Sequence, residues 1–280
     1  MIIDLLSKQS KSPLLLAYIE IYESIASQDV SAGSPAFQSE LELAQRAKMD
    51  ARKIGNVSGL KILEIGPGYG HLAKELTERG ATVSVADLVP HYMERILIEI
   101  KGRAYLMDIQ QSPMDLDQEF DLIIMCDVLE HVFRPADALL TAQLLLKPGG
   151  KLYVRSPSHE SLITYACSLG YPIEIVHLRT YTKSLLEMEL RAAGFINIKG
   201  PKKLPKSMFV PRNLFARSFY WKIVRREAKG LPTSNVQSAI KLALHGRPST
   251  RYGVIFKITR PLFKLISKPS ELASLATKPS

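Results

Sequence analysis

Short apolar stretches alternate with amphipathic stretches through the middle of the chain. Five stretches rich in Ile, Leu and Val are predicted to be strands buried on both faces, near residues 60–65, 82–87, 103–107, 120–126 and 150–156. Segments with helical spacing separate them; one ends at Gly80 and another begins at Pro135. This alternation predicts a doubly wound α/β fold with a mostly parallel sheet and right-handed crossovers.

Helical patterns also flank this alternating region. Residues 1–57 are predicted to be helical, with an apolar segment near 14–25, a loop at 31–35 and a more polar segment near 37–54. Residues 182–193 form a further predicted helix, in which Ser184 and Glu187 have the spacing of a capping box. Residues 195–199 are predicted to be the sixth strand.

Three alternating glycines, Gly66, Gly68 and Gly70, follow the first predicted strand and precede a helix. Glycine lets the backbone turn sharply and lets a ligand approach closely, so this order is typical of a nucleotide-type cofactor site. Glu64 lies inside the preceding strand and the glycine spacing differs from the NAD fingerprint, which favours a cofactor carrying cationic groups over a pyrophosphate. Asp87, at the end of the next strand, can accept hydrogen bonds from a ribose diol.

These features resemble motif I of the class I S-adenosylmethionine (SAM) dependent methyltransferases. Four further segments resemble that family's motifs in its order: the second strand, the third strand, motif IV and the turn into strand five, at residues 81–87, 105–109, 120–131 and 146–152. The resemblance covers residues 58–200. It implies SAM as the cofactor, S-adenosylhomocysteine as its product and a Rossmann-like methyltransferase fold with a seven-stranded sheet.

The resemblance also implies which residues hold the cofactor, in the crevice beyond the carboxyl ends of the strands. The methionine half of SAM would be lined by Glu64, Gly66, Gly68 and Gly70. Asp87 would hold the ribose, Leu88 would flank the adenine, and Asp108 with Ile109 would address its edge. The backbone around Cys126 and Asp127 would close the floor. Two alternatives stay open: a helix N-cap for Asp87 and a turn role for Asp108.

The sulfonium supplies most of the chemistry, so the protein must place the acceptor and accept its proton. Six residues qualify by position as a base or an acceptor contact: His131, His159, His177, Asp127, Glu130 and Tyr181. His131 lies in a Glu-His-Val segment that resembles small-molecule methyltransferases, where this histidine contacts the substrate in some members and is packed in others. His159 and His177 are equally plausible candidates. No cluster of His and Cys indicates a metal site.

The absence of two motifs narrows the range of acceptors that fit the sequence. Methyltransferases that act on exocyclic amines of nucleobases resemble one another in an (Asp or Asn)-Pro-Pro-(Tyr or Phe) motif, whereas here Cys126 to His131 occupy that place. Neither Cys126 nor Cys167 has the setting of an attacking cysteine in C5-pyrimidine methyltransferases. The segments 147–150 and 177–181 instead resemble the branch that acts on quinone precursors, sugars and other small metabolites.

Charged residues are distributed unevenly along the chain. Residues 201–280 contain 17 Lys and Arg against two Asp and Glu, whereas residues 1–200 contain 20 against 25. This asymmetry indicates an anionic partner, which could be a membrane surface, a phosphorylated substrate or a nucleic acid; the alternative is a solubilising surface. Two cysteines fit a reduced cytosolic protein, and we expect neither a secretory signal nor a transmembrane helix. The predicted location is therefore cytoplasmic, with peripheral membrane contact.

Four regions follow: an N-terminal helical cover (1–57), a SAM-binding core (58–200), a basic helical insertion (201–250) and a last strand with a basic tail (251–280). The family's antiparallel seventh strand is expected at residues 252–258, and residues 259–280 are expected to be a basic amphipathic stretch with a frayed end. In the insertion, Phe215 and Phe219 have helical spacing among Arg and Lys residues.

Three functions fit these observations. The leading hypothesis is methyl transfer to a small or lipid-linked acceptor, at an oxygen of a sugar or polysaccharide intermediate or of a quinone-type lipid. The basic region would contact an anionic membrane. The second is an RNA methyltransferase that stacks bases on aromatic residues of the insertion, although no recognised RNA-binding module supports nucleic acid as a partner. The third is a non-catalytic SAM-binding protein. The sequence pattern leaves the oligomeric state open.

Overall fold

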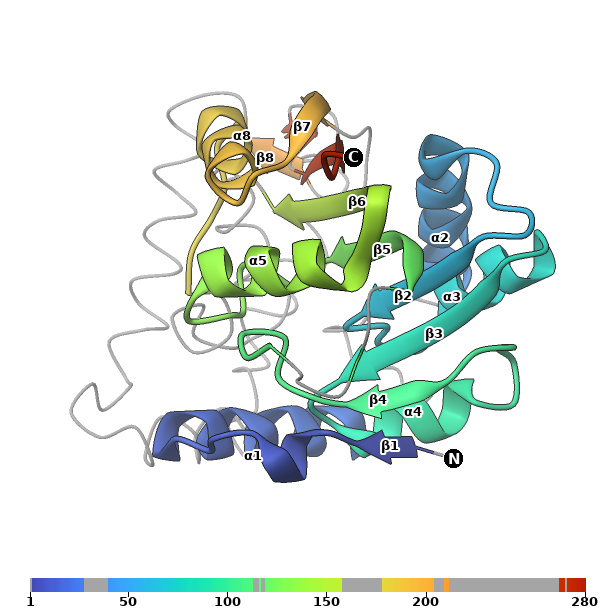
Figure 1. Cartoon of the computed structure of the whole chain (residues 1–280), viewed down its shortest axis with the longest axis vertical. Coiled ribbons are helices and arrows are strands. Elements are labelled where there is room, and N and C mark those ends of the chain that lie inside the picture. Colours follow the sequence, from blue (N-terminus) through green and yellow to red (C-terminus); the bar gives the residue numbers. More distant parts are fainter. Residues whose placement is uncertain are drawn as a thin grey trace.

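The fold is an eight-stranded sheet with helices on both faces (Figure 1). The computed structural model describes residues 2–27, 40–112, 116, 119–157, 178–203, 209–211, 267–269 and 271–280. In spatial order the sheet contains β1 (Ile2–Asp4), β4 (Ala104–Leu106), β3 (Thr82–Asp87), β2 (Lys61–Ile65), β5 (Phe120–Cys126), β6 (Leu146–Pro157), β10 (Glu271–Thr277) and β7 (Ile196–Lys203). The pairs from β1 to β6 are parallel, and β10 is antiparallel to both of its neighbours.

Two apolar layers sandwich the sheet. On one face lie α5 (Pro135–Leu145) and α8 (Lys183–Ala192); on the other lie α2 (Glu40–Ile54), α3 (His71–Glu78) and α4 (Pro90–Ile96). Neighbouring strand residues face opposite layers, so Leu63 packs in the first and Ile62 in the second. The doubly wound arrangement predicted from the apolar alternation is therefore confirmed.

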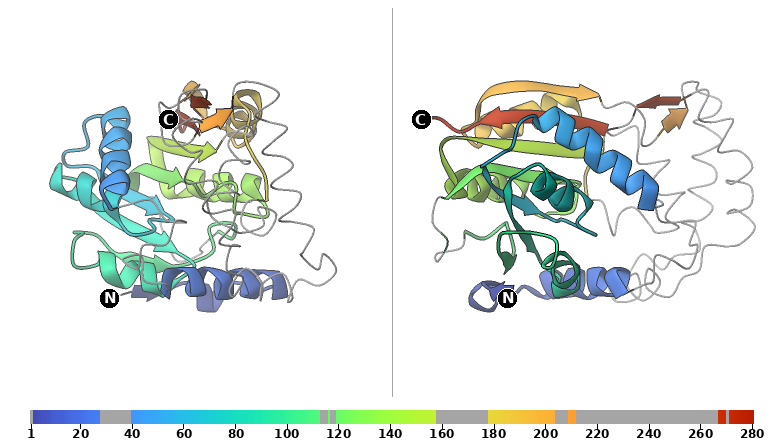
Figure 2. Two further views of the ribbon diagram at one scale, coloured as in Figure 1. Left: turned by 180° about the vertical axis from the view of Figure 1, so that it is seen from behind. Right: turned by 90° about the vertical axis from the view of Figure 1, so that its right-hand side faces the viewer.

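The N-terminus adds an edge strand that the sequence pattern did not indicate. Residues 1–57 were expected to be helical, and α1 (Pro13–Ser27) and α2 are helices, but Ile2–Asp4 pair in parallel with β4. A stretch of two isoleucines is too short for periodicity to reveal a strand. The strand forms here because β4 offers an open edge. A short 3₁₀ helix (Leu6–Lys8) follows. In both views of Figure 2, α1 lies beside this edge of the sheet.

The antiparallel strand lies nearer the C-terminus than expected. It is β10, Glu271–Thr277, so the expectation of a frayed basic end there is wrong. Small residues give this segment a weak strand pattern, yet Leu272 and Ala276 are buried between β6 and β7, and this context overrides propensity. Residues 252–258 lie outside the described residues. Past the predicted start of the insertion, β7 continues to Lys203, and β8 (Phe209–Pro211) pairs with β9 (Ser267–Pro269).

The start of α8 also differs from the expectation. Thr182 is its N-cap, and the Thr182 side chain accepts a hydrogen bond from the Leu185 amide at 3.1 Å. The predicted capping box between Ser184 and Glu187 is therefore wrong, because Ser184 already lies inside the helix. Within the described part of the chain, no helix is long and apolar enough to span a membrane.

Candidate active site

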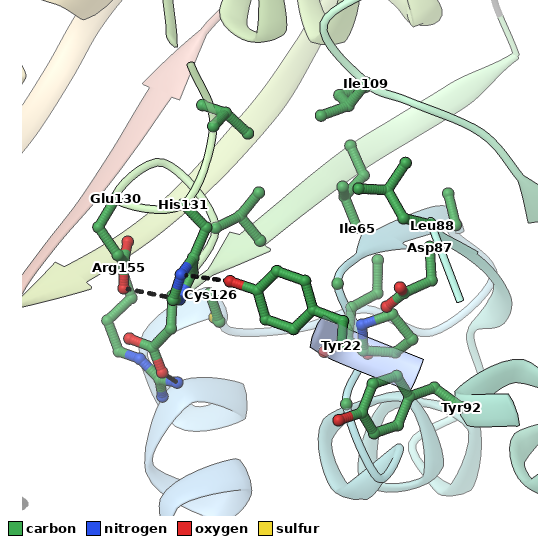
Figure 3. Close-up of a pocket in the computed structure, with 18 of the residues that line it drawn as sticks. Tyr22, Ile65, Asp87, Leu88, Tyr92, Ile109, Cys126, Glu130, His131 and Arg155 are labelled. Atoms are coloured by element: carbon green, nitrogen blue, oxygen red, sulfur yellow. Dashed lines mark hydrogen bonds and ion pairs between the residues drawn. The ribbon is translucent and has the colours of Figure 1, made fainter. Parts of the chain in front are cut away.

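A cavity of about 420 Å³ lies at the carboxyl ends of β2, β3, β4 and β5. Most of the predicted site residues line it: Glu64, Gly66, Gly68, Asp87, Leu88, Asp108, Ile109, Cys126, Asp127, Glu130 and His131. Figure 3 shows Asp87, Leu88 and Tyr92 on one side and Glu130, His131 and Arg155 on the other. Tyr22, from α1, lies between the two groups.

Among the other predicted candidates, Tyr181 does not line this cavity. His159 and His177 lie outside the described residues. Tyr181 is fully buried in the core, and its hydroxyl donates to Glu189 Oε2 at 2.9 Å. Tyr181 does not line the cavity, so the structure gives it a packing role instead of an acceptor contact.

The glycine loop needs its glycines for different reasons. Gly66 has φ +66°, and a Cβ there would lie 2.8 Å from Val128 Cγ2. Gly70 has φ +81°, and a Cβ there would lie 2.5 Å from Ile96 Cγ1, so Gly70 serves packing behind the loop. Gly68 lines the cavity, and no heavy atom lies within 4 Å of the position its Cβ would take. The loop therefore brings bare backbone to the cavity.

Two acidic groups flank this loop. Glu64 is buried, burial raises its pKa to about 8, and its Oε2 atom has no hydrogen-bond partner among the described residues. Burial also raises the pKa of Asp87 to about 7, although the amides of Val89 and Leu88 oppose this shift. Asp87 Oδ1 accepts from the Val89 amide at 3.0 Å, and Val89 is the N-cap of α4, so Asp87 is not the helix cap. Both carboxyl groups suit a ligand that donates hydrogen bonds.

A buried charge network forms one end of the cavity, and the sequence analysis missed most of it. Arg155 binds Asp127 Oδ2 through Nη2 at 2.7 Å and also pairs with Asp50. Arg46, from α2, lies 2.9 Å from Asp127 Oδ2 and pairs with Glu271 of β10. Although burial opposes its ionisation, the guanidinium groups of Arg155 and Arg46 hold the pKa of Asp127 well below its usual range. The sequence signal for this network was Arg155, a charged residue inside an otherwise apolar strand.

Beside this network, on the same side of the cavity, lie His131 and a tyrosine that the sequence analysis did not select. His131 Nδ1 and the Tyr22 hydroxyl form a 2.7 Å hydrogen bond, with the rings edge to face. Glu130 Oε1 lies 3.9 Å from His131 Nε2, and Ser156 Oγ donates to Glu130 Oε2 at 2.8 Å. Burial, reinforced by Asp127, raises the pKa of Glu130 to about 8. Tyr18 and Phe133, with ring centroids 4.8 Å apart, add an aromatic wall.

A model of the family described as "Methyltransferase domain" matches residues 37–199. The chain belongs to this methyltransferase family. The glycine loop, the acid after β3 and the segment after β5 all lie within the matched residues, which agrees with the class I SAM-dependent resemblance.

Curated relatives match this methyltransferase over a shorter segment. The ubiquinone biosynthesis O-methyltransferase of Xylella fastidiosa (strain M23) is 36% identical over 104 residues, which are 35% of this chain and 42% of that protein. The protein of that name from Nitrosococcus oceani is 34% identical over 107 residues, 36% of this chain and 45% of its own. The match therefore spans less than half of these relatives.

Solved structures show the same fold at low identity. Phosphoethanolamine N-methyltransferase 2 of Haemonchus contortus, bound to S-adenosylhomocysteine, has a TM-score of 0.55 at 16% identity, over 94% of this chain and 61% of that one. A SAM-dependent methyltransferase from Archaeoglobus fulgidus has a TM-score of 0.53 at 17% identity, over 86% and 95%. The cyclase SpnF has a TM-score of 0.55 at 15% identity, over 96% and 98%. The chain thus shares the fold of these three proteins.

The cavity of this methyltransferase fits SAM. The unpartnered oxygen of Glu64 suits the cationic methionine end, and the bare backbone at Gly68 leaves room for it. Asp108 also forms a local turn: its Oδ1 accepts from the backbone and side-chain nitrogens of Gln110, at 3.0 and 2.9 Å. The turn role left open for Asp108 is therefore confirmed, and its contact with the adenine edge stays a prediction.

We expect the methyltransferase to bind S-adenosylhomocysteine more weakly as the pH falls below about 7. Burial raises the Asp87 pKa, so the carboxyl of the empty site is protonated below that value. Ribose hydroxyls donate to the ionised form, so binding releases a proton, and the Kd should rise up to about tenfold per pH unit. Calorimetry from pH 8 to 6 measures this. Asp87→Asn should bind weakly at pH 8 with a flatter profile, whereas the exposed Asp137→Asn control should follow the wild type.

Proposed function

We propose that the protein transfers the methyl group of SAM to an oxygen of a small or lipid-linked acceptor. The observation that carries this proposal is the hydrogen-bonded pair of Tyr22 and His131, which faces the cavity across from Asp87. A methyl transfer to a hydroxyl needs a group that accepts the hydroxyl proton next to the cofactor. The Tyr22–His131 pair supplies such a group in the cavity that the glycine loop lines.

The residues of the chain hold the acceptor and move its proton. When bound, SAM supplies an electrophilic methyl group on its sulfonium. The Tyr22–His131 pair would accept the proton of the acceptor O–H group as the acceptor oxygen takes the methyl group that SAM would supply. Glu130 Oε1 lies 3.9 Å from the other ring nitrogen of His131, so a proton on the ring favours the ionised form of Glu130, whose pKa burial raises. Ser156 fixes the Glu130 side chain.

The shape of the cavity wall supports an acceptor with an apolar ring. Leu15 and Tyr18 of α1 line the cavity together with Val132 and Phe133 of the segment after β5. Aromatic side chains of this kind pack well against a planar ring. The named O-methyltransferase relatives agree with a quinone-type lipid as the acceptor, and a sugar or polysaccharide intermediate is the second group that we propose.

A lipid-linked acceptor would require contact with a membrane. The excess of 15 positive charges in residues 201–280 supports such contact with an anionic surface, where each Lys or Arg contributes about 1 kcal/mol. Most of this region lies outside the described residues, so the argument rests on the sequence. Cosedimentation with anionic vesicles tests it, and binding that is not weakened by deletion of residues 212–250, which contain eight of the 17 Lys and Arg, would contradict it.

Two other functions remain as competing hypotheses. An RNA methyltransferase would use Phe215, Phe219, Tyr220 and Trp221, which lie outside the described residues. A protein that binds SAM without methyl transfer is the other, and the cyclase SpnF is a protein of this fold whose name states a different reaction. The Tyr22–His131 pair favours a reactive acceptor site over binding alone.

Incubating the purified protein with methyl-labelled SAM and an extract of the source cells separates these hypotheses. The products are divided into organic, aqueous small-molecule, polymer and RNA fractions. We expect label in the organic fraction for a quinone-type lipid, and in the aqueous or polymer fraction for a sugar or polysaccharide. Label in RNA would establish the second hypothesis. Absence of label, with S-adenosylhomocysteine binding intact, would favour the third.

A further inference from the structure

The N-terminal arm, residues 2–12, follows the edge of the sheet to the cofactor end of the cavity. Its first residues form β1, paired with β4 from Ile2↔Ala104 to Asp4↔Leu106, and the Leu5 amide then donates to the Leu106 carbonyl at 3.0 Å. Beyond β4 the chain turns into residues 107–111, of which Met107, Asp108, Ile109 and Gln110 line the cavity. The arm therefore runs beside the loop that the family resemblance places next to the adenine.

The Gln9 carboxamide joins the arm to this loop through both of its polar atoms. Gln9 Oε1 accepts from the Asp108 amide at 2.7 Å. Gln9 Nε2 donates to the carbonyl oxygens of Asp108, at 3.0 Å, and Gln111, at 2.9 Å. Ser10 adds two bonds through its backbone alone: its amide donates to Gln111 Oε1 at 2.9 Å, and its carbonyl accepts from Gln111 Nε2 at 2.8 Å.

The same arm leads directly into the acceptor side of the cavity. Ser12 Oγ accepts from the Leu15 amide at 3.1 Å in the first turn of α1. From α1, Leu15, Tyr18 and Tyr22 line the cavity, and Tyr22 bonds to His131. Gln9 and Tyr22 are thus two attachments of one short segment, the first at the loop after β4 and the second at the segment after β5.

We propose that Gln9 is a positioning residue that couples cofactor binding at the loop 108–111 to the placement of α1 against the acceptor side. A ligand that orders this loop strengthens the three Gln9 hydrogen bonds, and these hold the start of α1. The coupling is reciprocal, since a placed α1 in turn favours the ordered loop. The acceptor contact of α1 rests on the proposed methyl transfer, whereas the link from the loop 108–111 to α1 is independent of it.

Gln9→Ala tests the coupling, with Ser10→Ala as a matched control. Ser10 contacts Gln111 through backbone atoms, so Ser10→Ala keeps its hydrogen bonds. For Gln9→Ala we expect a Kd for S-adenosylhomocysteine about tenfold above the wild type. Hydrogen exchange of the α1 amides should slow when S-adenosylhomocysteine saturates the wild type or Ser10→Ala, and should stay fast in saturated Gln9→Ala.

A second variant covers the case in which Gln9→Ala fails to fold. Gln9→Glu has the same size and can still accept from the Asp108 amide, but cannot donate to the carbonyl oxygens of Asp108 and Gln111, so it should show the same loss of α1 protection. Equal protection of α1 in the wild type and the folded Gln9 variants would overturn the proposal. Neither readout uses an acceptor, so failure of the coupling is distinguishable from failure of methyl transfer.

Discussion

Replacing Arg155 by Met should lower the free energy of unfolding by about 3–5 kcal/mol, because the carboxylates of Asp50 and Asp127 would lose their shared buried partner. The Arg155 side chain is 7% exposed and that of Asp50 is 3% exposed. Water therefore has little access to Asp50, although Asp127 is 29% exposed, and methionine fills the volume of the guanidinium without its charge. Urea denaturation at neutral pH, followed by circular dichroism, measures the loss.

An exposed arginine provides the control for this prediction. Arg191 pairs with Glu187 one helical turn away, at 2.8 Å, with side chains 61% and 41% exposed. Arg191→Met should change the free energy of unfolding by less than about 0.5 kcal/mol, as is usual for such pairs. A loss below about 0.5 kcal/mol in both variants would contradict the account of a buried charge network around Arg155.

The second large effect concerns the proposed base. His131→Asn should lower the rate of methyl transfer by about 10²–10⁴-fold, the usual contribution of a general base. Tyr22→Phe removes the hydroxyl that bonds to Nδ1 and should lower kcat by a smaller factor. Both variants should lose far less affinity for S-adenosylhomocysteine than rate, because the pair lies on the acceptor side of the cavity and reaches the cofactor loop only through α1. Single-turnover assays with the acceptor found by label fractionation measure the rate.

Tyr181→Phe is the matched control for Tyr22→Phe. It also removes one tyrosine hydroxyl from a hydrogen bond, here to Glu189, but at a position that does not line the cavity. Its rate of methyl transfer should equal that of the wild type. If His131→Asn kept the full rate, or lost rate and cofactor affinity in proportion, His131 would not be the base.

The parallel core was predictable because its strands are buried on both faces and its turns carry local signals. The glycine loop and Asp87 were also predictable from local sequence, because each lies at the end of a predicted strand. β10 was not predictable from its own residues: Ala273, Ser274 and Ala276 have weak strand propensity and become a strand between two others. Local patterns report what a segment prefers, whereas β10 depends on its neighbours.

The site residues that the sequence did not predict also depend on distant parts of the chain. Tyr22 and His131 lie 109 positions apart in sequence, and Arg46 and Glu271 lie 225 apart. The helical stripe containing Tyr22 predicts only that one face of α1 is covered, and cannot tell that this tyrosine meets a histidine. Arg155 carried a signal, a charge within an apolar strand, but its partners Asp50 and Asp127 come from other elements.

Calorimetric titration with S-adenosylhomocysteine tests most directly that this cavity is the SAM site. The account predicts one site in the wild type. It predicts a Kd about 10- to 100-fold higher in Gly66→Ala, where a Cβ would be strained at φ +66° and crowd Val128 in the loop that lines the cavity. Gly59→Ala, at φ +77° with open space and no place in the cavity lining, should bind like the wild type. Absence of binding to the wild type, or equal affinity in Gly66→Ala, would contradict the account.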